Sequence, residues 1–392
     1  MRRFAAAASE HPLASHAAGE VIGEVMDQLG RGPDLAVLFA TGDHTGVFEE
    51  LAYAVDELLA PQVLIGCTAA SVLAGPQELE ETPAVSLFAG RVGAVAPVRL
   101  DVVESPDGTV VVGMPDEAVD ARTLVLLADP FSFPGDDFLT ALAVQYPGLR
   151  AIGGLASAAR DPGGNRLLVG RSIHDDGAVG VLLDSSMPVD LVVSQGCRPV
   201  GQPFVVTRAE RNVIYELGGQ PALDRLQHLL DETEGDERRL LAQGLHIGIV
   251  VDEQQEAFDQ GDFLIRAVLG VDRSVGAVAV GEQVPVGSIV QFQVRDAQTA
   301  DDDLRHLLAG GAAEGALVFT CNGRGERFFD EPHHDAELVH AVAGDATAGL
   351  FCAGEIGPIG MRNATHGYTA SVLLFGGDRD AGQNDTRGGA DR

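Results

Sequence analysis

The stretch "LAVLFATGDH" (35–44) sets the expected fold. Its run of apolar and small residues predicts a buried strand that ends in polar residues at Thr41-Gly42-Asp43-His44. Residues 48–59 follow with apolar side chains at helical spacing, and "VLIGCTAA" (63–70) predicts a second buried strand. Two buried strands joined through a helix favour parallel pairing with a right-handed crossover.

The same order of elements recurs twice along the chain. Strands are expected at 83–90, 123–132, 151–158, 177–184, 316–325, 349–356 and 369–376, with helices at 136–145 and 334–343. We therefore predict an α/β protein with mixed, largely parallel sheets, helices outside, and repeated β-α-β-β units in two domains. Because the copies match in pattern rather than in residue identity, a chance similarity of pattern is the alternative.

Composition limits the classes of function. The 392 residues include 45% hydrophobic residues, which excludes wholesale disorder. The formal net charge of -32 argues against nucleic acid or an anionic membrane surface as a partner. All 26 basic residues counted as Lys or Arg are Arg, so phosphate binding by a P-loop lysine and Schiff-base chemistry are excluded.

The cysteines and the hydrophobic runs predict an ordinary intracellular protein. Cys67, Cys197, Cys321 and Cys352 lie far apart in the sequence and form no close ligand pair, so we expect no metal site, no disulfide and no cofactor. The beginning "MRRFAAAASEH" is too short in its apolar part for a signal peptide, and no run reaches the ~20 apolar residues of a membrane span. A cytoplasmic location is expected.

The strand ends predict a pocket, because ligands of β-α-β folds bind beyond the carboxyl ends of parallel strands. In "GLFCAGEIGPIG" (349–360), a thiol and a carboxylate stand three residues apart among glycines, directly after a buried strand. We expect residues 65–68, 321–324 and 352–355 to converge on one cavity. The alternative is a glycine-rich turn with Cys352 as a small core residue.

The central part of the chain differs from the repeated units. Broken strand-like runs fill 166–207, and Pro221 precedes a helical stretch with an apolar face. The charged segment 231–239 is expected at the surface as a candidate boundary. Four further strands are expected at 245–251, 262–272, 276–281 and 288–296.

Several motifs together resemble the FIST family. They are "IGCTAA" (65–70), "SQGCRPVG" (194–201), "YELGGQPAL" (215–223), "FTCNGRG" (319–325) and "FCAGEIGPIGMRNATHGYTASVLLF" (351–375). The resemblance implies a FIST N-terminal domain at 30–211 and a FIST C domain at 212–376, followed by a disordered tail at 377–392. It also implies a sensory protein that binds a small polar metabolite, such as an amino acid, and acts through a signalling protein partner.

The resemblance also implies which residues bind the ligand. These are Cys67, Thr68, Cys197, Arg198, Cys321, Gly323, Arg324, Cys352, Glu355, Arg362, Asn363 and His366. Two positions depart from the usual pattern, which has Gly at Met361 and a bulky apolar residue near Ala364. We expect Met361 to narrow the approach to the pocket.

Binding, catalysis and scaffolding remain three alternatives at this stage. For a zwitterionic ligand, Arg324 or Arg362 would hold the carboxylate and Glu355 the ammonium group. An enzyme, either a hydrolase or a transferase, would use Cys352 as nucleophile, His366 as base and Glu355 as the orienting group. Because no GxSxG or HExxH motif is present, catalysis is not the preferred reading. The third alternative is a protein-interaction scaffold with a vestigial pocket.

Overall fold

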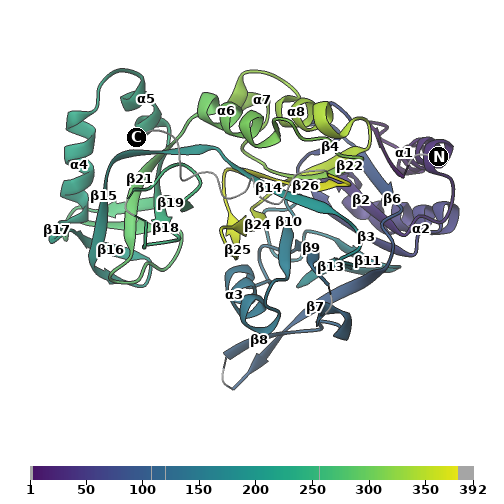
Figure 1. The fold of residues 1–392 in the computed structure, drawn as a ribbon, viewed down its shortest axis with the longest axis horizontal. Coiled ribbons are helices and arrows are strands. Elements are labelled where there is room, and N and C mark those ends of the chain that lie inside the picture. The colour runs from purple at the N-terminus through teal and green to yellow at the C-terminus, as the bar shows by residue number, and fades with distance from the viewer. Residues whose placement is uncertain (1–2, 107, 120, 256, 378–392) are drawn as a thin grey trace.

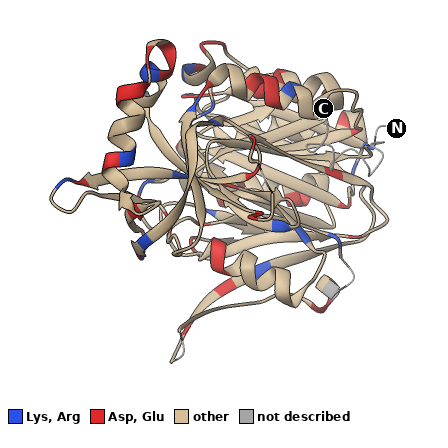
Figure 2. Ribbon diagram, turned by 60° about the vertical axis from the view of Figure 1, so that its left-hand side comes forward, with Lys and Arg blue, Asp and Glu red and all other residues tan. Residues whose placement is uncertain are grey.

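The computed structural model describes residues 3–106, 108–119, 121–255 and 257–377. Three sheets surround one apolar core, each with its outer face covered by helices, and a closed barrel of strands stands to one side (Figure 1). Charged residues lie mainly on the outer helices and loops (Figure 2). The predicted tail at 377–392 lies outside the described residues except for Gly377.

The first sheet carries the strands that open the chain. Its order is β1 (Phe4–Ser9), β6 (Val85–Gly90), β2 (Leu35–Thr41), β3 (Val63–Ala69), β11 (Leu167–Val169) and β12 (Ser172–His174). Helices α1 (Ala14–Leu29) and α2 (Phe48–Leu59) cover its outer face, and the short 3₁₀ helix η1 (Gly42–Val47) leads into α2. Helix α2 has the bounds predicted from sequence, but Leu58, which its spacing assigns to the apolar face, is 52% exposed.

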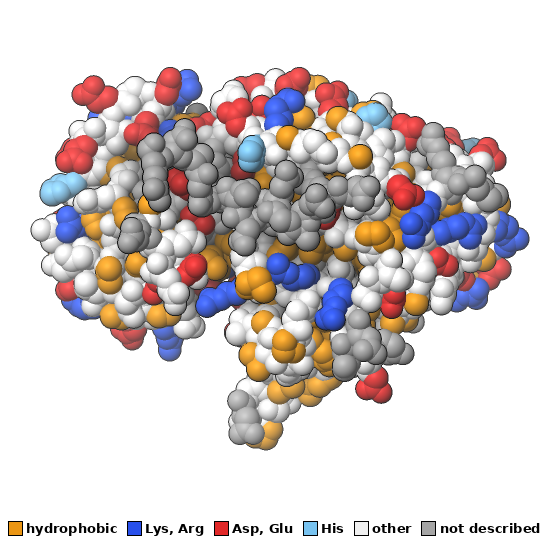
Figure 3. Space-filling view, in the orientation of Figure 1, with side chains coloured by type: hydrophobic (Ala, Val, Ile, Leu, Met, Phe, Trp, Pro, Cys, Tyr) orange, Lys and Arg blue, Asp and Glu red, His pale blue; other side chains and the backbone are white. Residues whose placement is uncertain are grey.

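The second sheet combines strands from both ends of the chain. Its order is β25 (Arg362–His366), β24 (Glu355–Ile359), β10 (Arg150–Leu155), β9 (Thr123–Ala128), β13 (Ala178–Leu183), β7 (Val95–Ser105) and β8 (Gly108–Val112). Helix α3 (Gly135–Gln145) covers its outer face, and η2 (Asp116–Val119) precedes β9. The β7–β8 hairpin projects from the body, as the space-filling view shows (Figure 3).

The third sheet contains the motif-bearing strands. Its order is β14 (Val189–Gln195), β26 (Thr369–Phe375), β22 (Gly315–Cys321), β23 (Thr347–Cys352), β4 (Val72–Ala74) and β5 (Gln77–Leu79). Helices α6 (Ala297–Leu308) and α8 (His334–Ala343) cover its outer face. The single turn α7 (Glu326–Phe329) follows β22 in the sequence and precedes α8. Helix α8 begins and ends where its pattern predicts.

The central part of the chain forms the barrel. Its strands are β15 (Cys197–Glu210), β21 (Ile289–Arg295), β18 (Leu245–Val250), β19 (Phe263–Asp272), β20 (Ala277–Val280), β16 (Val213–Leu217) and β17 (Gln220–Pro221). Pairing of β15 with β16 closes the ring. The predicted charged segment 231–239 spans the end of α4 (Ala222–Glu232) and the start of α5 (Gly235–Gln243).

The prediction of largely parallel sheets is wrong. In the described part of the chain, parallel pairing joins β2 to β3, β9 to β10 and β22 to β23, whereas the other pairings are antiparallel. The apolar runs misled the prediction because they are buried on both faces, by helices on one side and the central core on the other. Complete burial produces such runs in strands of either direction. That the three strand–helix–strand segments are copies of one unit stays a prediction.

The two ends of the chain exchange strands. Strand β4, from the first part, pairs antiparallel with β23, and β24, from the last part, pairs antiparallel with β10. The aromatic rings of Phe4, Phe88 and Phe375 stack where the first and third sheets meet. The ends of β22 and β23 are therefore fixed against the first half of the chain. No helix among the described residues is both long and apolar enough to cross a membrane.

Candidate functional site

The parallel strands β22 and β23 bring two sequence motifs together. Cys321 and Cys352 are paired at the ends of these strands, and the Asn322 amide donates to the Cys352 carbonyl at 2.9 Å. Strand β24 starts three residues after Cys352, with Glu355 opposite Gly154 of β10. The predicted residues Cys321, Gly323, Arg324, Cys352 and Glu355 therefore share one region.

Arg324 is the centre of a buried ionic network. Its side chain is 0% exposed, and its Nε and Nη2 donate to Asp335 Oδ2 and Oδ1 at 2.8 and 2.9 Å. Thr320 Oγ1 also donates to Asp335 Oδ2, at 2.5 Å. Burial alone would raise the pKa of Asp335, but the Arg324 guanidinium and the hydrogen bonds hold that pKa well below its usual range. The Arg324 plane is thus fixed by a bidentate clamp.

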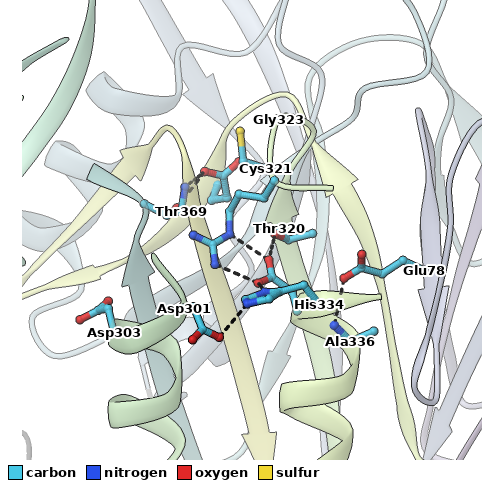
Figure 4. A network of polar contacts seen from close by, with 12 residues as sticks. Glu78, Asp301, Asp303, Thr320, Cys321, Gly323, His334, Ala336 and Thr369 are labelled. Carbon is cyan, nitrogen blue, oxygen red and sulfur yellow. Dashed lines mark hydrogen bonds and ion pairs between the residues drawn. The ribbon is translucent and has the colours of Figure 1, made fainter. Parts of the chain in front are cut away.

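His334 extends this network toward the surface. Its ring stacks on Phe329 with centroids 3.5 Å apart. Nδ1 lies 3.0 Å from Asp335 Oδ1 and Nε2 lies 2.8 Å from Asp301 Oδ1, so the ring bridges two carboxylates (Figure 4). Neither His334 nor Asp335 is among the site residues predicted from the sequence.

A carboxyl group from the first half of the chain caps helix α8. Glu78 Oε1 accepts a hydrogen bond from the Ala336 amide at 3.0 Å, a contact drawn in Figure 4. The Glu78 amide in turn donates to His333 Nδ1 at 3.0 Å. Burial, together with the nearby Asp335 charge, raises the pKa of Glu78 to about 8. Strand β5 is therefore attached to α8 through polar contacts as well as packing.

Glu355 is a second buried carboxyl beside Arg324. Its Oε2 accepts from the Thr369 amide at 3.0 Å and from Thr369 Oγ1 at 2.8 Å. Burial raises the pKa of Glu355 to about 8, although the Thr369 bonds, the Arg324 charge and the Cys321 thiol act in the opposite direction. Its Oε1 is buried and has no hydrogen-bond partner in the described structure.

The barrel supplies the facing side of this region. The Arg295 guanidinium lies between the rings of Phe328 and Tyr368, 4.4 and 4.8 Å from their centroids. Arg295 Nη2 donates to the Gly323 carbonyl at 2.6 Å, so the barrel contacts the loop that carries Arg324. Tyr368 has a φ of 64°, a left-handed conformation that is uncommon for an aromatic residue. We call this region, between the ends of β18 and β21 and the ends of β22 and β24, the junction.

Buried polar atoms without partners gather at the junction. Six such atoms belong to five side chains there: Arg324 Nη1, Glu355 Oε1, Arg295 Nε, His246 Nδ1, and Gln293 Nε2 and Oε1. An unmade hydrogen bond of a buried group costs about 1–3 kcal/mol. So many unmet groups in one place favour a bound polar species over a purely structural region.

Cys197 and the cysteines at the strand ends are buried thiols. Cys197 lies opposite Arg295 in the β15–β21 pair, and burial raises the pKa of Cys197 and Cys321 to about 12. Burial also raises the pKa of Cys67 and Cys352. Thiols with raised pKa values are poor nucleophiles at neutral pH.

Other residues of the predicted set have structural partners away from the junction. Thr68 Oγ1 accepts from the Arg166 amide, and Arg198 pairs with Asp296 and Glu237 at 2.9 Å. Asn363 holds two backbone groups next to the second sheet, since Oδ1 accepts from the Ala151 amide and Nδ2 donates to the Leu149 carbonyl.

Arg362 and Met361 are exposed. Arg362 lies opposite Ile359, four residues along β24 from Glu355, which at about 3.4 Å per residue is roughly 14 Å away. Met361 is 87% exposed in the turn between β24 and β25, so it does not narrow an approach to the junction. Ala364 is buried on β25.

The contacts of Cys352 and His366 do not form a nucleophile–base pair. His366 Nε2 lies 3.1 Å from the Gly357 carbonyl, and Cys352 Sγ contacts the Leu350 carbonyl at 3.9 Å. In the described structure no hydrogen bond joins the two side chains. Burial lowers the pKa of His366 to about 4, which makes it a weak base.

Sequence reasoning missed the residues that come from the barrel. Arg295, His246 and Gln293 lie outside every quoted motif, and only tertiary structure brings them to β22 and β24. Tyr368 and Thr369 could have been predicted as site residues, because both belong to the motif at 351–375.

Comparisons with known proteins identify two domain models along the chain and several relatives of similar length. A family model described as the FIST N domain matches residues 34–220, and one described as the FIST C domain matches residues 222–358. "Uncharacterized protein Rv0628c" of Mycobacterium tuberculosis is 42% identical over 381 residues, covering 95% of this chain and 99% of the relative. "Uncharacterized protein Mb0898c" of Mycobacterium bovis is 42% identical over 377 residues, covering 94% and 97%.

Proposed function

The chain belongs to the FIST family, and from this premise we propose that it binds an amino-acid-like metabolite at the junction and reports it to a signalling partner. FIST domains are generally described as small-ligand sensory domains in signalling proteins. The finer assignment, to a ligand with both a carboxylate and an ammonium group, rests on the side chains of the junction.

One observation carries the proposal: cationic and acidic groups with unmet hydrogen-bonding capacity lie together in a buried place. Arg324 Nη1 and Arg295 Nε are donors without acceptors, and Glu355 Oε1 is buried without a partner and becomes an acceptor when the carboxyl ionises. A ligand carboxylate would accept from the arginines, and a ligand ammonium would donate to Glu355. A zwitterion meets both demands, whereas a neutral apolar molecule meets neither.

The protonation of Glu355 gives the proposal a signature. Its pKa of about 8 leaves the free protein largely protonated at this carboxyl at pH 7. An ammonium group favours the ionised form, so binding releases a proton. Affinity for such a ligand should therefore rise with pH up to about 8 and then level off.

The first experiment is a thermal-shift screen of the purified protein with amino acids and with their deaminated carboxylate analogues. Calorimetry then gives the affinity of each hit in buffers of different ionisation enthalpy, which measures the protons released. We expect Arg295→Gln to weaken binding roughly 10- to 150-fold, as for loss of a charge-assisted bond of about 1.5–3 kcal/mol.

Two variants separate a binding role from a structural one. Glu355→Gln keeps the shape of the side chain and should abolish both the proton release and the preference for ammonium-bearing ligands. Arg362→Ala is the matched control, since it removes an exposed arginine of the same motif. Unchanged affinity in both Arg295→Gln and Glu355→Gln would refute the proposal.

We also propose the domain bounds, the location and the partner. We assign the FIST N-terminal domain to 30–211 and the FIST C domain to 212–376, and we place the protein in the cytoplasm with a protein partner that receives the signal. Of the predicted ligand-binding residues, Cys197, Cys321, Gly323, Arg324 and Glu355 are retained, and Arg295 takes over the role first given to Arg362.

A further inference from the structure

Two buried polar side chains stand opposite each other on neighbouring barrel strands. His246 of β18 and Gln293 of β21 are direct partners in the antiparallel register. They are 4% and 1% exposed. The backbone of Gly248 lies so close to Gln293 that an added Cβ would stand 2.6 Å from Nε2. A glycine therefore leaves room there for a buried amide.

Three hydrogen-bonding atoms of this pair have no partner in the described structure. Gln293 offers Nε2 as a donor and Oε1 as an acceptor. Nδ1 of the buried His246 ring has no partner in the described structure. Burial, with the Arg295 charge nearby, lowers the pKa of His246 to about 4, so the ring is neutral and Nδ1 is able to accept in one of its two tautomers.

The complement of one donor and two acceptors is a group with one acceptor and two donors. A primary carboxamide has this composition, since its carbonyl oxygen accepts and its NH₂ donates twice. We propose that Gln293 and His246 form a subsite for a primary carboxamide on the ligand. The carbonyl would accept from Gln293 Nε2, and the NH₂ would donate to Gln293 Oε1 and His246 Nδ1.

The subsite lies within reach of the groups proposed to hold the amino acid head. Gln293 and Arg295 point to the same face of β21, two residues or about 7 Å apart along the strand. The Tyr368 ring connects the two places, with its centroid 4.3 Å from that of His246 and 4.8 Å from the Arg295 guanidinium carbon. This inference rests on the proposed function. Given that function, the spacing indicates that the ligands are amino acids with a carboxamide side chain.

The same atoms reject the nearest competitors. A side-chain carboxylate would bring its charge against two acceptors, Gln293 Oε1 and His246 Nδ1. An ester or an alkyl chain of equal length would leave both acceptors unmet. Sites that hydrogen-bond a buried polar group discriminate strongly against analogues that lack it, because the site's own groups are then left unpaired.

Calorimetry on the full chain tests the subsite with five probes: glutamine, asparagine, glutamate, glutamate γ-methyl ester and norvaline. We expect glutamine or asparagine to bind at least 100-fold more tightly than the other three. In Gln293→Met, which keeps the length of the side chain, the preference for the amide over norvaline should fall to less than tenfold. Gln298→Met, at an exposed position of α6, is the matched control and should leave the preference unchanged.

A sixth probe, succinamate, has a carboxylate and a carboxamide but no ammonium group, and it separates the two proposals. If amino acids bind without preference for the amide, the subsite is wrong and the proposed function stands. If succinamate binds in a Gln293-dependent way and amino acids do not, the amino-acid function is wrong and the subsite stands. If none of the six binds, both are wrong. Should Gln293→Met fail to fold, the comparison of glutamine with norvaline in the unaltered protein still decides the question.

Discussion

Replacing Asp335 by Asn should destabilise the protein strongly without creating a cavity. The substitution keeps the shape of the side chain but removes the charge that faces Arg324, whose side chain is 0% exposed. The guanidinium would remain buried, and its two bonds to the carboxylate at 2.8 and 2.9 Å would lose their ionic partner. Breaking a buried ion pair on one side typically costs about 3–5 kcal/mol.

Urea unfolding followed by circular dichroism measures this loss as a fall in the free energy of unfolding. Asp236→Asn is the matched control, since that carboxylate is 90% exposed and its pairing with Arg239 should contribute less than about 1 kcal/mol. The double replacement Arg324→Met with Asp335→Leu removes both charges and should restore most of the loss. A cost below about 1 kcal/mol for Asp335→Asn would refute the reasoning, because a buried pair cannot be broken so cheaply.

The Arg324–Asp335 ion pair also predicts how the free energy of unfolding declines at acid pH. The pKa of Asp335 is depressed in the folded protein, so its contribution is present above its unfolded pKa of about 3.9 and is lost as pH falls below it. Asp335→Asn should therefore flatten the decline of stability below about pH 4, whereas Asp236→Asn should not.

Three further outcomes are expected. The pKa values of Glu355 and Glu78 are raised to about 8, so the free energy of unfolding should fall as pH rises from about 4.5 to 8. The fall should be at most about 1.4 kcal/mol per pH unit for each carboxyl, and Glu355→Gln should reduce that slope in urea titrations. Cys352 should resist iodoacetamide in the native protein at pH 7 and react after unfolding, as mass spectrometry of the labelled peptide would show; rapid native labelling would favour a catalytic thiolate. Arg362→Ala should change the free energy of unfolding by less than about 0.5 kcal/mol, and a larger loss would mean that this exposed arginine has a structural partner.

The sequence predicts the local elements well because hydrophobic spacing reports burial. Helices α2 and α8 have the predicted bounds, and β2 and β3 fall within the predicted runs, whereas β22 and β23 begin one and two residues before theirs. Strand direction is a different property. An apolar run shows that both faces are covered, and in this protein antiparallel strands such as β26 meet that condition as fully as parallel ones.

Some residues of the candidate site could be predicted from the sequence, whereas others depend on tertiary structure. Arg324 and Glu355 follow buried strands directly, so their position at a strand end could be inferred from the chain. Arg295 and Gln293 sit on a barrel strand whose alternation looks ordinary, and nothing local indicates which face meets β22. Arg362 shows the opposite case, because it shares a motif with Glu355 but lies at the far end of the β24–β25 pair.

Arg324 has nitrogens that are held by Asp335 and one nitrogen that has no partner. Two of its nitrogens are held by Asp335, which Thr320 and His334 in turn hold, while the third nitrogen, Nη1, is buried and unmet beside Gly196. A side chain held in this way has already lost its conformational freedom on folding, so a ligand that bonds to Nη1 pays little to order it. The clamp therefore lowers the entropic cost of binding, and the same contacts join the junction through His334 to Asp301 on α6. A continuous chain of polar contacts therefore links the proposed ligand site to a helix on the outer face of the third sheet.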